Sequence, residues 1–240
     1  MTLRIYHTSD LHDHRGFAPR LQALRQQKPG LLFDCGDALR GSQTVYYRNE
    51  PIVADLERAG YDAQALGNRE FHYVFGLLAA RARRMQHPLV CTNLIDLWKR
   101  PLPFVPQLDF VRDGWTVRVF ALLVPQYPEG SVWERMLGWR FRDPRRTARE
   151  IAQSASSDTI LVALSHLGLR ADRELARAVP RVDLILGGHS HDTLTAPELV
   201  GDVPIVHAGP YGRCVSRTEL ERDTPRRARI ARFDLVPLLD

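Results

Sequence analysis

Short apolar runs alternate with segments of helical pattern along most of the chain. The runs are β-prone, whereas the segments between them repeat apolar residues every three or four positions. This alternation predicts βαβ units with a largely parallel sheet. The predicted strands are 3–9, 30–37, 63–68, 88–93, 158–166 and 182–189, and the predicted helices are 19–27, 52–60, 77–85, 142–155 and 171–179. Asp143 and Pro144 have the residue types of an N-cap and a first helical position, so the fourth helix should begin there.

Other stretches predict antiparallel strands. Asp113 and Gly114 separate two strand-like runs within residues 104–125, and Asp-Gly is a strong signal for a two-residue hairpin. The C-terminal segments 203–223 and 226–238 also predict antiparallel strands. No linker, low-complexity tract or internal repeat interrupts the sequence. We therefore expect these strands to extend and complete one mixed α/β fold.

Length and composition favour a single domain over residues 1–240, with 44% apolar residues to form its core. The chain has 33 basic and 28 acidic residues, and the net charge of +5 mildly favours anionic partners. Its arginines are spread along the chain without the aromatic interleaving of single-strand binders. We therefore do not expect a nucleic-acid partner.

Three widely spaced cysteines fit neither a disulfide framework nor a metal clip, so we expect a reducing, cytoplasmic compartment. The N-terminus lacks the pattern of a signal peptide, and no run of 18 apolar residues occurs. We expect no membrane partner. The sequence does not indicate an oligomeric state.

Five of the predicted strands end in potential metal ligands. Ligands of open α/β sheets bind beyond the carboxyl ends of the strands, so these five ends should converge. Asp10 and His12 are two residues apart, as are His189 and His191, and an extended backbone would point each pair to one side. The five segments read SDLHDH, DCGDALRG, LGNREFH, LSHLG and GGHSH.

The ligand types point to two metal ions. Carboxylate and imidazole together suit Zn²⁺, Mn²⁺ or Fe, whereas an all-oxygen set would suggest Mg²⁺ or Ca²⁺. Seven ligands are too many for one ion, so we expect two divalent ions about 3.5 to 4 Å apart that share a carboxylate. Asp37, at the middle strand end, is the natural bridge. The seven candidate ligands are Asp10, His12, Asp37, Asn68, His166, His189 and His191.

The ordered set D-x-H, G-D, G-N-x-E, a lone His and G-H-x-H resembles the calcineurin-like metallophosphoesterase superfamily. The segments HTSDLHDH, GDALRGS, GNREFHY, LSHLG, LILGGHSH and GPYGR are similar to its 5'-nucleotidase and cyclic-nucleotide phosphodiesterase branch. The resemblance implies a four-layer α/β/β/α sandwich of two mixed sheets. It also implies one metal on Asp10, His12 and His191, a second on Asn68, His166 and His189, and Asp37 as the bridge.

The sequence departs from that branch in two ways. Nucleotidases of the branch carry a C-terminal domain that clamps the nucleobase, and we do not expect that domain within these 240 residues. The branch also has a His after the metal-binding Asn, credited with protonating the leaving group, and an Asp three residues later that orients it. This chain has Arg69 and His72 at those two positions.

The predicted function is hydrolysis of a phosphomonoester or phosphodiester, with nucleotides among the candidates, by in-line attack of a water activated on two metals. Asn68 and Arg69 should contact the phosphate, since a guanidinium forks onto phosphate oxygens but is a poor proton donor. His72 would replace the missing acid if a helix beginning at this strand end put it beside Arg69. Tyr211 is a candidate for substrate contact, and Glu70 is expected to support the turn.

Two alternatives remain open from the sequence. The missing family His favours a descendant that keeps its metals but only binds a phosphorylated ligand. The basic charge favours a metal-dependent nuclease, whose binding would fall steeply with salt.

Overall fold

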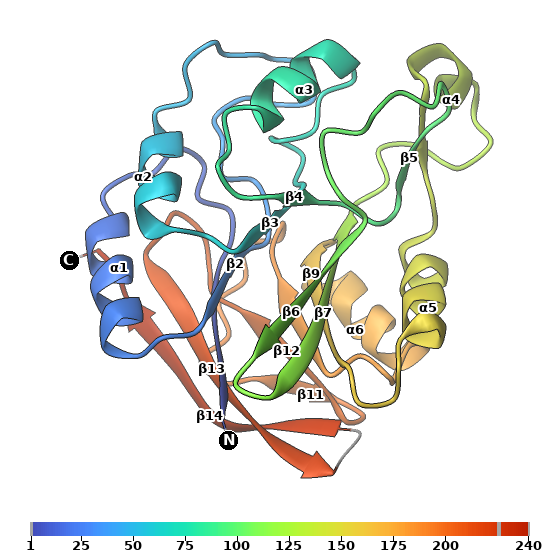
Figure 1. The fold of residues 1–240 in the computed structure, drawn as a ribbon. Helices are drawn as coiled ribbons and strands as arrows, with labels where there is room; N and C mark the ends of the chain where they lie inside the picture. The colour runs from blue at the N-terminus through green and yellow to red at the C-terminus, as the bar shows by residue number, and fades with distance from the viewer. Residues whose placement is uncertain (1, 225–226, 240) are drawn as a thin grey trace.

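The computed structural model describes residues 2–224 and 227–239 and contains two six-stranded mixed sheets (Figure 1). The strands of the first sheet are β1 (Leu3–Thr8), β2 (Leu31–Asp34), β3 (Ala63–Ala65), β4 (Leu89–Val90), β13 (Cys214–Thr224) and β14 (Arg227–Pro237). They lie in the order β14-β13-β1-β2-β3-β4. Strands β1 to β4 are parallel, and β13 and β14 extend the sheet antiparallel from β1.

The second sheet is also mixed, with parallel strands in the centre and an antiparallel strand at each edge. Its strands are β6 (Gln107–Arg112), β7 (Trp115–Leu123), β9 (Ile160–His166), β10 (Leu184–Gly187), β11 (Glu198–Val200) and β12 (Val203–His207). Their order is β11-β12-β10-β9-β7-β6, in which β12, β10, β9 and β7 are parallel. A small separate sheet pairs β5 (Leu94–Asp96) with β8 (Trp139–Phe141).

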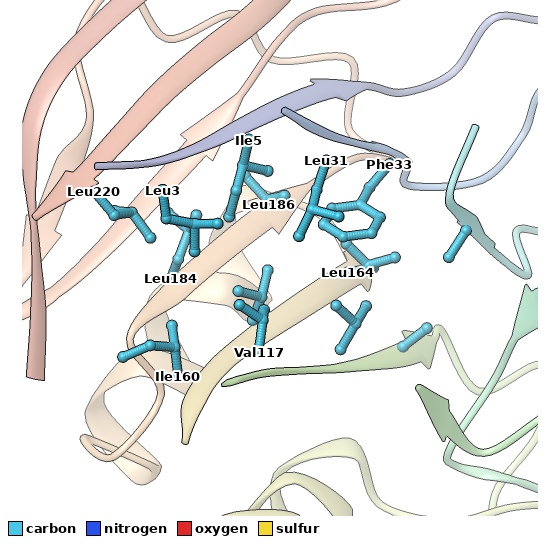
Figure 2. Close-up of a cluster of buried hydrophobic side chains, with 14 of the residues drawn as sticks. Leu3, Ile5, Leu31, Phe33, Val117, Ile160, Leu164, Leu184, Leu186 and Leu220 are labelled. Carbon is cyan, nitrogen blue, oxygen red and sulfur yellow. The ribbon is translucent and has the colours of Figure 1, made fainter. Parts of the chain in front are cut away.

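The two large sheets face each other across a layer of buried apolar side chains. Figure 2 shows Leu3, Ile5 and Phe33 of the first sheet pointing toward Leu164 and Leu186 of the second. Each of these side chains is buried. Full burial of such a side chain contributes about 1.5–3 kcal/mol, so this layer holds the sheets together.

Helices cover the outer face of each sheet. The helices are α1 (Ala18–Gln27), α2 (Ile52–Ala59), α3 (Phe75–Ala82), α4 (Val132–Leu137), α5 (Pro144–Ser154) and α6 (Leu169–Ala178). Helices α1 and α2 pack on β1 and β2, and α5 and α6 pack on β7, β9 and β10. The layers therefore run α/β/β/α, as the resemblance implied. In the part of the chain that the structure describes, no helix is both long and apolar enough to cross a membrane.

The predicted hairpin is confirmed between β6 and β7. Asp113 and Gly114 both have positive φ angles, 50° and 75°, the combination that matches a tight turn to strand twist. The predicted start of α5 is also confirmed, because the Asp143 carboxylate accepts a hydrogen bond from the Arg146 amide at 2.7 Å.

The C-terminal prediction was partly wrong. β13 and β14 are antiparallel as expected, but β12 runs parallel to β10 and antiparallel only to the edge strand β11. Residues 192–202 return the chain to the edge of the sheet, so β12 enters it in the same direction as β10. Helix α4 and the small sheet of β5 and β8 were not predicted.

Candidate metal centre

The predicted ligands follow the carboxyl ends of five parallel strands, three in the first sheet and two in the second. β1, β2 and β3 end at Thr8, Asp34 and Ala65, β9 ends at His166, and β10 ends at Gly187. Hydrogen bonds between the loops join these ends. The Asp10 amide donates to the Gly36 carbonyl and the His12 amide to the Asp37 carbonyl, each at 2.9 Å. The expected convergence is therefore confirmed.

The reason given for pairing the ligands was wrong. The residues were expected on extended backbone, but Asp10, His12, His189 and His191 have φ angles of 53°, 48°, 75° and 59°. Asp37 has a φ of 60° as well. Non-glycine residues rarely adopt this left-handed conformation, and such backbone strain concentrates at functional sites. Tight left-handed turns after the strands, rather than strand alternation, bring the side chains together.

The first cluster consists of Asp10, His12 and His191, whose potential ligand atoms lie within 4.8 Å of one another. The His12 and His191 Nε2 atoms are 2.9 Å apart, and each is within 4 Å of Asp10 Oδ1. Burial lowers the pKa of His12 to about 4, and the nearby Arg69 guanidinium adds to this shift. Neutral imidazole is the form that binds metal, so the environment favours a ligand state.

The second cluster consists of Asp37, His166 and His189 within the same 4.8 Å limit. His166 Nε2 lies 3.3 Å from Asp37 Oδ1. The His166 Nδ1 is 2.8 Å from the Cys35 carbonyl oxygen, which fixes the ring with Nε2 toward Asp37. Burial lowers the pKa of His189 to about 4. The Asn68 amide nitrogen lies 3.5 Å from His189 Nδ1, so Asn68 reaches this cluster from β3.

The two clusters are neighbours. The His189 amide of the second donates to both carboxylate oxygens of Asp10 in the first, each at 3.0 Å. Burial raises the pKa of Asp10, and the negative charge of Asp37 raises it further. Two carboxylates held this close in a buried site favour a bound cation.

Glu70 organises the loop that carries Asp37. Its buried carboxylate accepts hydrogen bonds from the amides of Gly67, Asp37, Ala38 and Leu39, at 2.7 to 3.2 Å. The loop that carries Asp37 also lies so close to residue 67 that a side chain would not fit there. A Cβ on Gly67 would lie 2.5 Å from Asp37 Oδ1. The expectation that Glu70 supports this turn is confirmed.

Arg69 lies at the edge of the site beside Asp37. Its amide donates to Asp37 Oδ1 at 2.8 Å, and its Nε lies 4.0 Å from Asp37 Oδ2. Its Nη1 donates to the carbonyls of Arg40 at 3.0 Å and Gly41 at 3.5 Å. About a third of the side chain is exposed. The guanidinium is therefore held from one side and remains accessible for an anion.

The condition for His72 to act beside Arg69 is not met. Residues 68–70 form a turn, and α3 begins only at Phe75, so no helix aligns the two side chains. His72 is buried, and its Nδ1 accepts a hydrogen bond from the Val74 amide at 3.0 Å. Burial and the Arg81 guanidinium lower the pKa of His72.

Tyr211 lies beside the first cluster. Its amide donates to the Asp10 carbonyl at 2.8 Å, and its ring centroid is 5.7 Å from that of His12 and 5.5 Å from that of His191. The ring is partly exposed, so it forms part of the rim of the site.

Gln126 was missed by sequence reasoning. It follows β7, whose end pairs with His166 at the end of β9. Its Nε2 donates to Asn68 Oδ1 at 2.9 Å and to the Val124 carbonyl at 2.8 Å. An amide oxygen has two lone pairs, so Asn68 keeps one for a cation. The sequence does hold a signal for Gln126, because the apolar run VFALLV is followed closely by this polar residue, as the five ligand-bearing strands are followed by theirs.

The ion pair of His166 and Asp37 gives a pH prediction for the metal-free protein. Burial alone would lower the pKa of His166, but the Asp37 carboxylate outweighs it and raises the pKa to about 9. A folded-state pKa above the unfolded value stabilises the fold below about pH 6.5, and the gain is lost as pH rises through about 9. Relative to a His166→Asn variant, we expect the wild type to lose about 2 kcal/mol of unfolding free energy between about pH 6.5 and 8.5, measured by urea unfolding in chelator.

His166→Asn is the control for that measurement. Its unfolding free energy should change much less over the same range, because the titrating imidazole is gone. A wild-type loss no larger than that of His166→Asn would contradict the ion pair.

The residues present fit two divalent ions. Each cluster offers one carboxylate and two imidazoles, a donor set typical of Zn²⁺, Mn²⁺ and Fe sites. The buried His166 Nε2, which lies 3.3 Å from Asp37 Oδ1, makes no hydrogen bond among the described residues. Buried polar atoms are normally satisfied, and a metal ion would satisfy those that face it. The paired Asp/His clusters are typical of dinuclear metal centres.

Comparisons with known proteins identify the family. The sequence profile described as calcineurin-like phosphoesterase matches residues 3–193, most of the chain. The chain therefore belongs to the calcineurin-like phosphoesterase family. It is 32% identical over 241 residues to the uncharacterized metallophosphoesterase YunD of Bacillus subtilis, a match that covers 94% of this chain and 51% of YunD.

Two further relatives are 5'-nucleotidases. The chain is 25% identical over 268 residues to the 5'-nucleotidase of Vibrio cholerae, covering 91% of this chain and 48% of that protein. The crystal structure of a 5'-nucleotidase precursor from Thermus thermophilus superposes with a TM-score of 0.80 at 24% identity, covering 99% of this chain and 54% of that one. The chain thus spans about half the length of the curated relatives it matches.

Proposed function

We propose that this protein is a phosphoesterase that uses two divalent metal ions to hydrolyse a phosphomonoester or phosphodiester, with nucleotides as the first class to test. The observation that carries the proposal is the pair of neighbouring Asp/His clusters at the ends of parallel strands from both sheets. The 5'-nucleotidase relatives support the nucleotide class. Mn²⁺, Zn²⁺ and Fe are the candidate ions, since each accepts mixed carboxylate and imidazole ligands.

The seven candidate ligands form two sets of three and one shared carboxylate. Asp10, His12 and His191 would hold one ion, Asn68, His166 and His189 would hold the other, and Asp37 would contact both. Bound ions would supply Lewis acidity and an activated water.

Arg69 then binds the phosphate. Its guanidinium is fixed through Nη1 to two carbonyls while part of its surface is exposed beside Asp37. A phosphate oxygen bound there adds a charge-assisted hydrogen bond that holds the ester in place.

The test is hydrolysis of p-nitrophenyl phosphate, bis-p-nitrophenyl phosphate and a panel of nucleotides by protein loaded with Mn²⁺ or Zn²⁺. We expect turnover that chelator removes and either metal restores. Absence of turnover on every ester, with two metals bound, would reject the proposal.

A second candidate, a metal- and phosphate-binding protein with little catalysis, is favoured by Arg69 in place of the family His. The guanidinium is a poor proton donor, and His72, the residue expected to replace the acid, is buried and bonded to the Val74 amide. Tight phosphate binding without turnover on any ester would support this candidate.

A further inference from the structure

A pocket of about 360 Å³ lies next to the metal centre and outside the predicted ligand set. It lies between the loop that follows β7 and helix α4, which Figure 1 shows at the same end of the molecule as α3. Its lining residues are Tyr73, Gln126, Tyr127, Trp133 and Leu137. Three of these five residues are aromatic, so the pocket offers ring faces to a ligand.

Two of the rings are held rigidly. Tyr73 and Tyr127 are stacked, with centroids 6.4 Å apart and planes 18° from parallel. The Tyr127 hydroxyl donates to the Trp139 carbonyl at 2.7 Å, and the Trp139 indole donates to the Tyr73 carbonyl at 2.9 Å. The walls are thus ordered before any ligand binds, which lowers the entropy cost of binding.

Trp133 is the exposed wall. About half of its side chain is accessible, an unusual state for a tryptophan on a protein surface. It lies on α4 with Leu137, one turn apart, so both side chains face the pocket from the same side of the helix. An exposed indole beside an aromatic pocket is free to cover a planar ligand.

Gln126 connects the pocket to the metal centre. It lines the pocket and donates to Asn68 Oδ1 at 2.9 Å, while Gln43 Nε2 donates to its Oε1 at 2.9 Å. Asn68 in turn reaches His189 of the second cluster. Gln126 and Asn68 therefore link the lining of the pocket to the second cluster by two side-chain contacts.

We propose that this pocket binds the planar aromatic part of the group esterified to the phosphate, a nucleobase or aryl ring, with Trp133 stacking on it. The inference rests on the proposed phosphoesterase function and gives its substrate class. Stacking of a base on an aromatic side chain is worth roughly tenfold in affinity, and it does not discriminate strongly among bases.

The test compares an aromatic ester with an aliphatic one. KM is measured for adenosine 5'-monophosphate and for glycerol phosphate with Mn²⁺-loaded wild type, Trp133→Ala and Met136→Ala. Met136 is the matched control, because it lies on the same helix, is 62% exposed and does not line the pocket. We expect Trp133→Ala to raise KM for adenosine 5'-monophosphate about tenfold relative to KM for glycerol phosphate. Met136→Ala should leave this ratio of KM values unchanged.

Binding separates this inference from the proposed function. Calorimetric titration of the metal-loaded protein measures the affinity for adenosine 5'-monophosphate without requiring turnover. Trp133→Ala should lower this affinity about tenfold relative to the affinity for inorganic phosphate. Wild-type turnover with an unchanged KM ratio and unchanged binding in Trp133→Ala would overturn the pocket assignment alone. Absence of any metal-dependent turnover would reject the enzyme, while the binding comparison would still decide the pocket.

Discussion

Asp37→Asn is expected to lower kcat/KM for every phosphate ester by roughly 1,000-fold or more, because in the proposed centre Asp37 is the carboxylate that the two metals would share. Asp37 lies in the second cluster, and its backbone carbonyl accepts a hydrogen bond from the amide of His12 in the first. Burial would raise the pKa of Asp37, but the His166 imidazolium outweighs burial and holds the pKa below its usual range. The carboxylate is therefore ionised and ready to bind cations, whereas an amide is neutral.

The Asn variant preserves the fold, because its side-chain oxygen can still accept the hydrogen bond from the Arg69 amide. Metal content, measured on the same samples, should fall below two ions per chain. Asp13→Asn is the matched control, since Asp13 also has a left-handed backbone near the site but accepts a hydrogen bond from the Ile52 amide instead. An Asp37→Asn protein with two metals and more than about a tenth of the wild-type activity would contradict the bridging role.

Arg69→His is expected to raise turnover of alkyl phosphates by roughly 10- to 100-fold and turnover of aryl phosphates much less. General acid catalysis contributes about 10²- to 10⁴-fold, and an alkoxide needs the proton whereas p-nitrophenolate leaves without it. The introduced imidazole would stand beside Asp37, where the Arg69 side chain now lies. The measurement is kcat for glycerol phosphate and p-nitrophenyl phosphate at neutral pH.

Arg69→Gln separates loss of the guanidinium from gain of an acid. It removes the phosphate contact without adding a titratable group, so it should lower both rates and leave their ratio unchanged. Equal effects of Arg69→His on the two ester classes would be incompatible with a missing leaving-group acid.

Much of the fold followed from the sequence because its signals are local. Apolar patterns located the parallel strands β1 to β4, β9 and β10 but not the parallel direction of β7 and β12, and Asp113-Gly114 and Asp143-Pro144 marked a hairpin and a helix start. Helix α4 was not predicted because it has only six residues, and three of its exposed residues, Val132, Trp133 and Met136, are apolar. β12 was misjudged because strand direction depends on where the chain re-enters the sheet, which local pattern does not encode.

The convergence of the candidate ligands could be predicted because each residue lies at or just after a strand end, and the ends of parallel strands meet. The geometry of the site could not be predicted from the sequence. The left-handed turns at Asp10 and His189 depend on tertiary hydrogen bonds, such as that between the His189 amide and the Asp10 carboxylate. Gln126 and the pocket beside it were also hidden. They depend on how the end of β7 lies beside β9, which only the assembled sheet reveals.

The most direct test of the two-metal phosphoesterase is turnover of p-nitrophenyl phosphate against equivalents of Mn²⁺ added to chelator-stripped protein. The neighbouring clusters predict that activity rises until two ions are bound per chain and then stays constant. A plateau at one ion per chain, or turnover that does not depend on added metal, would contradict the dinuclear centre.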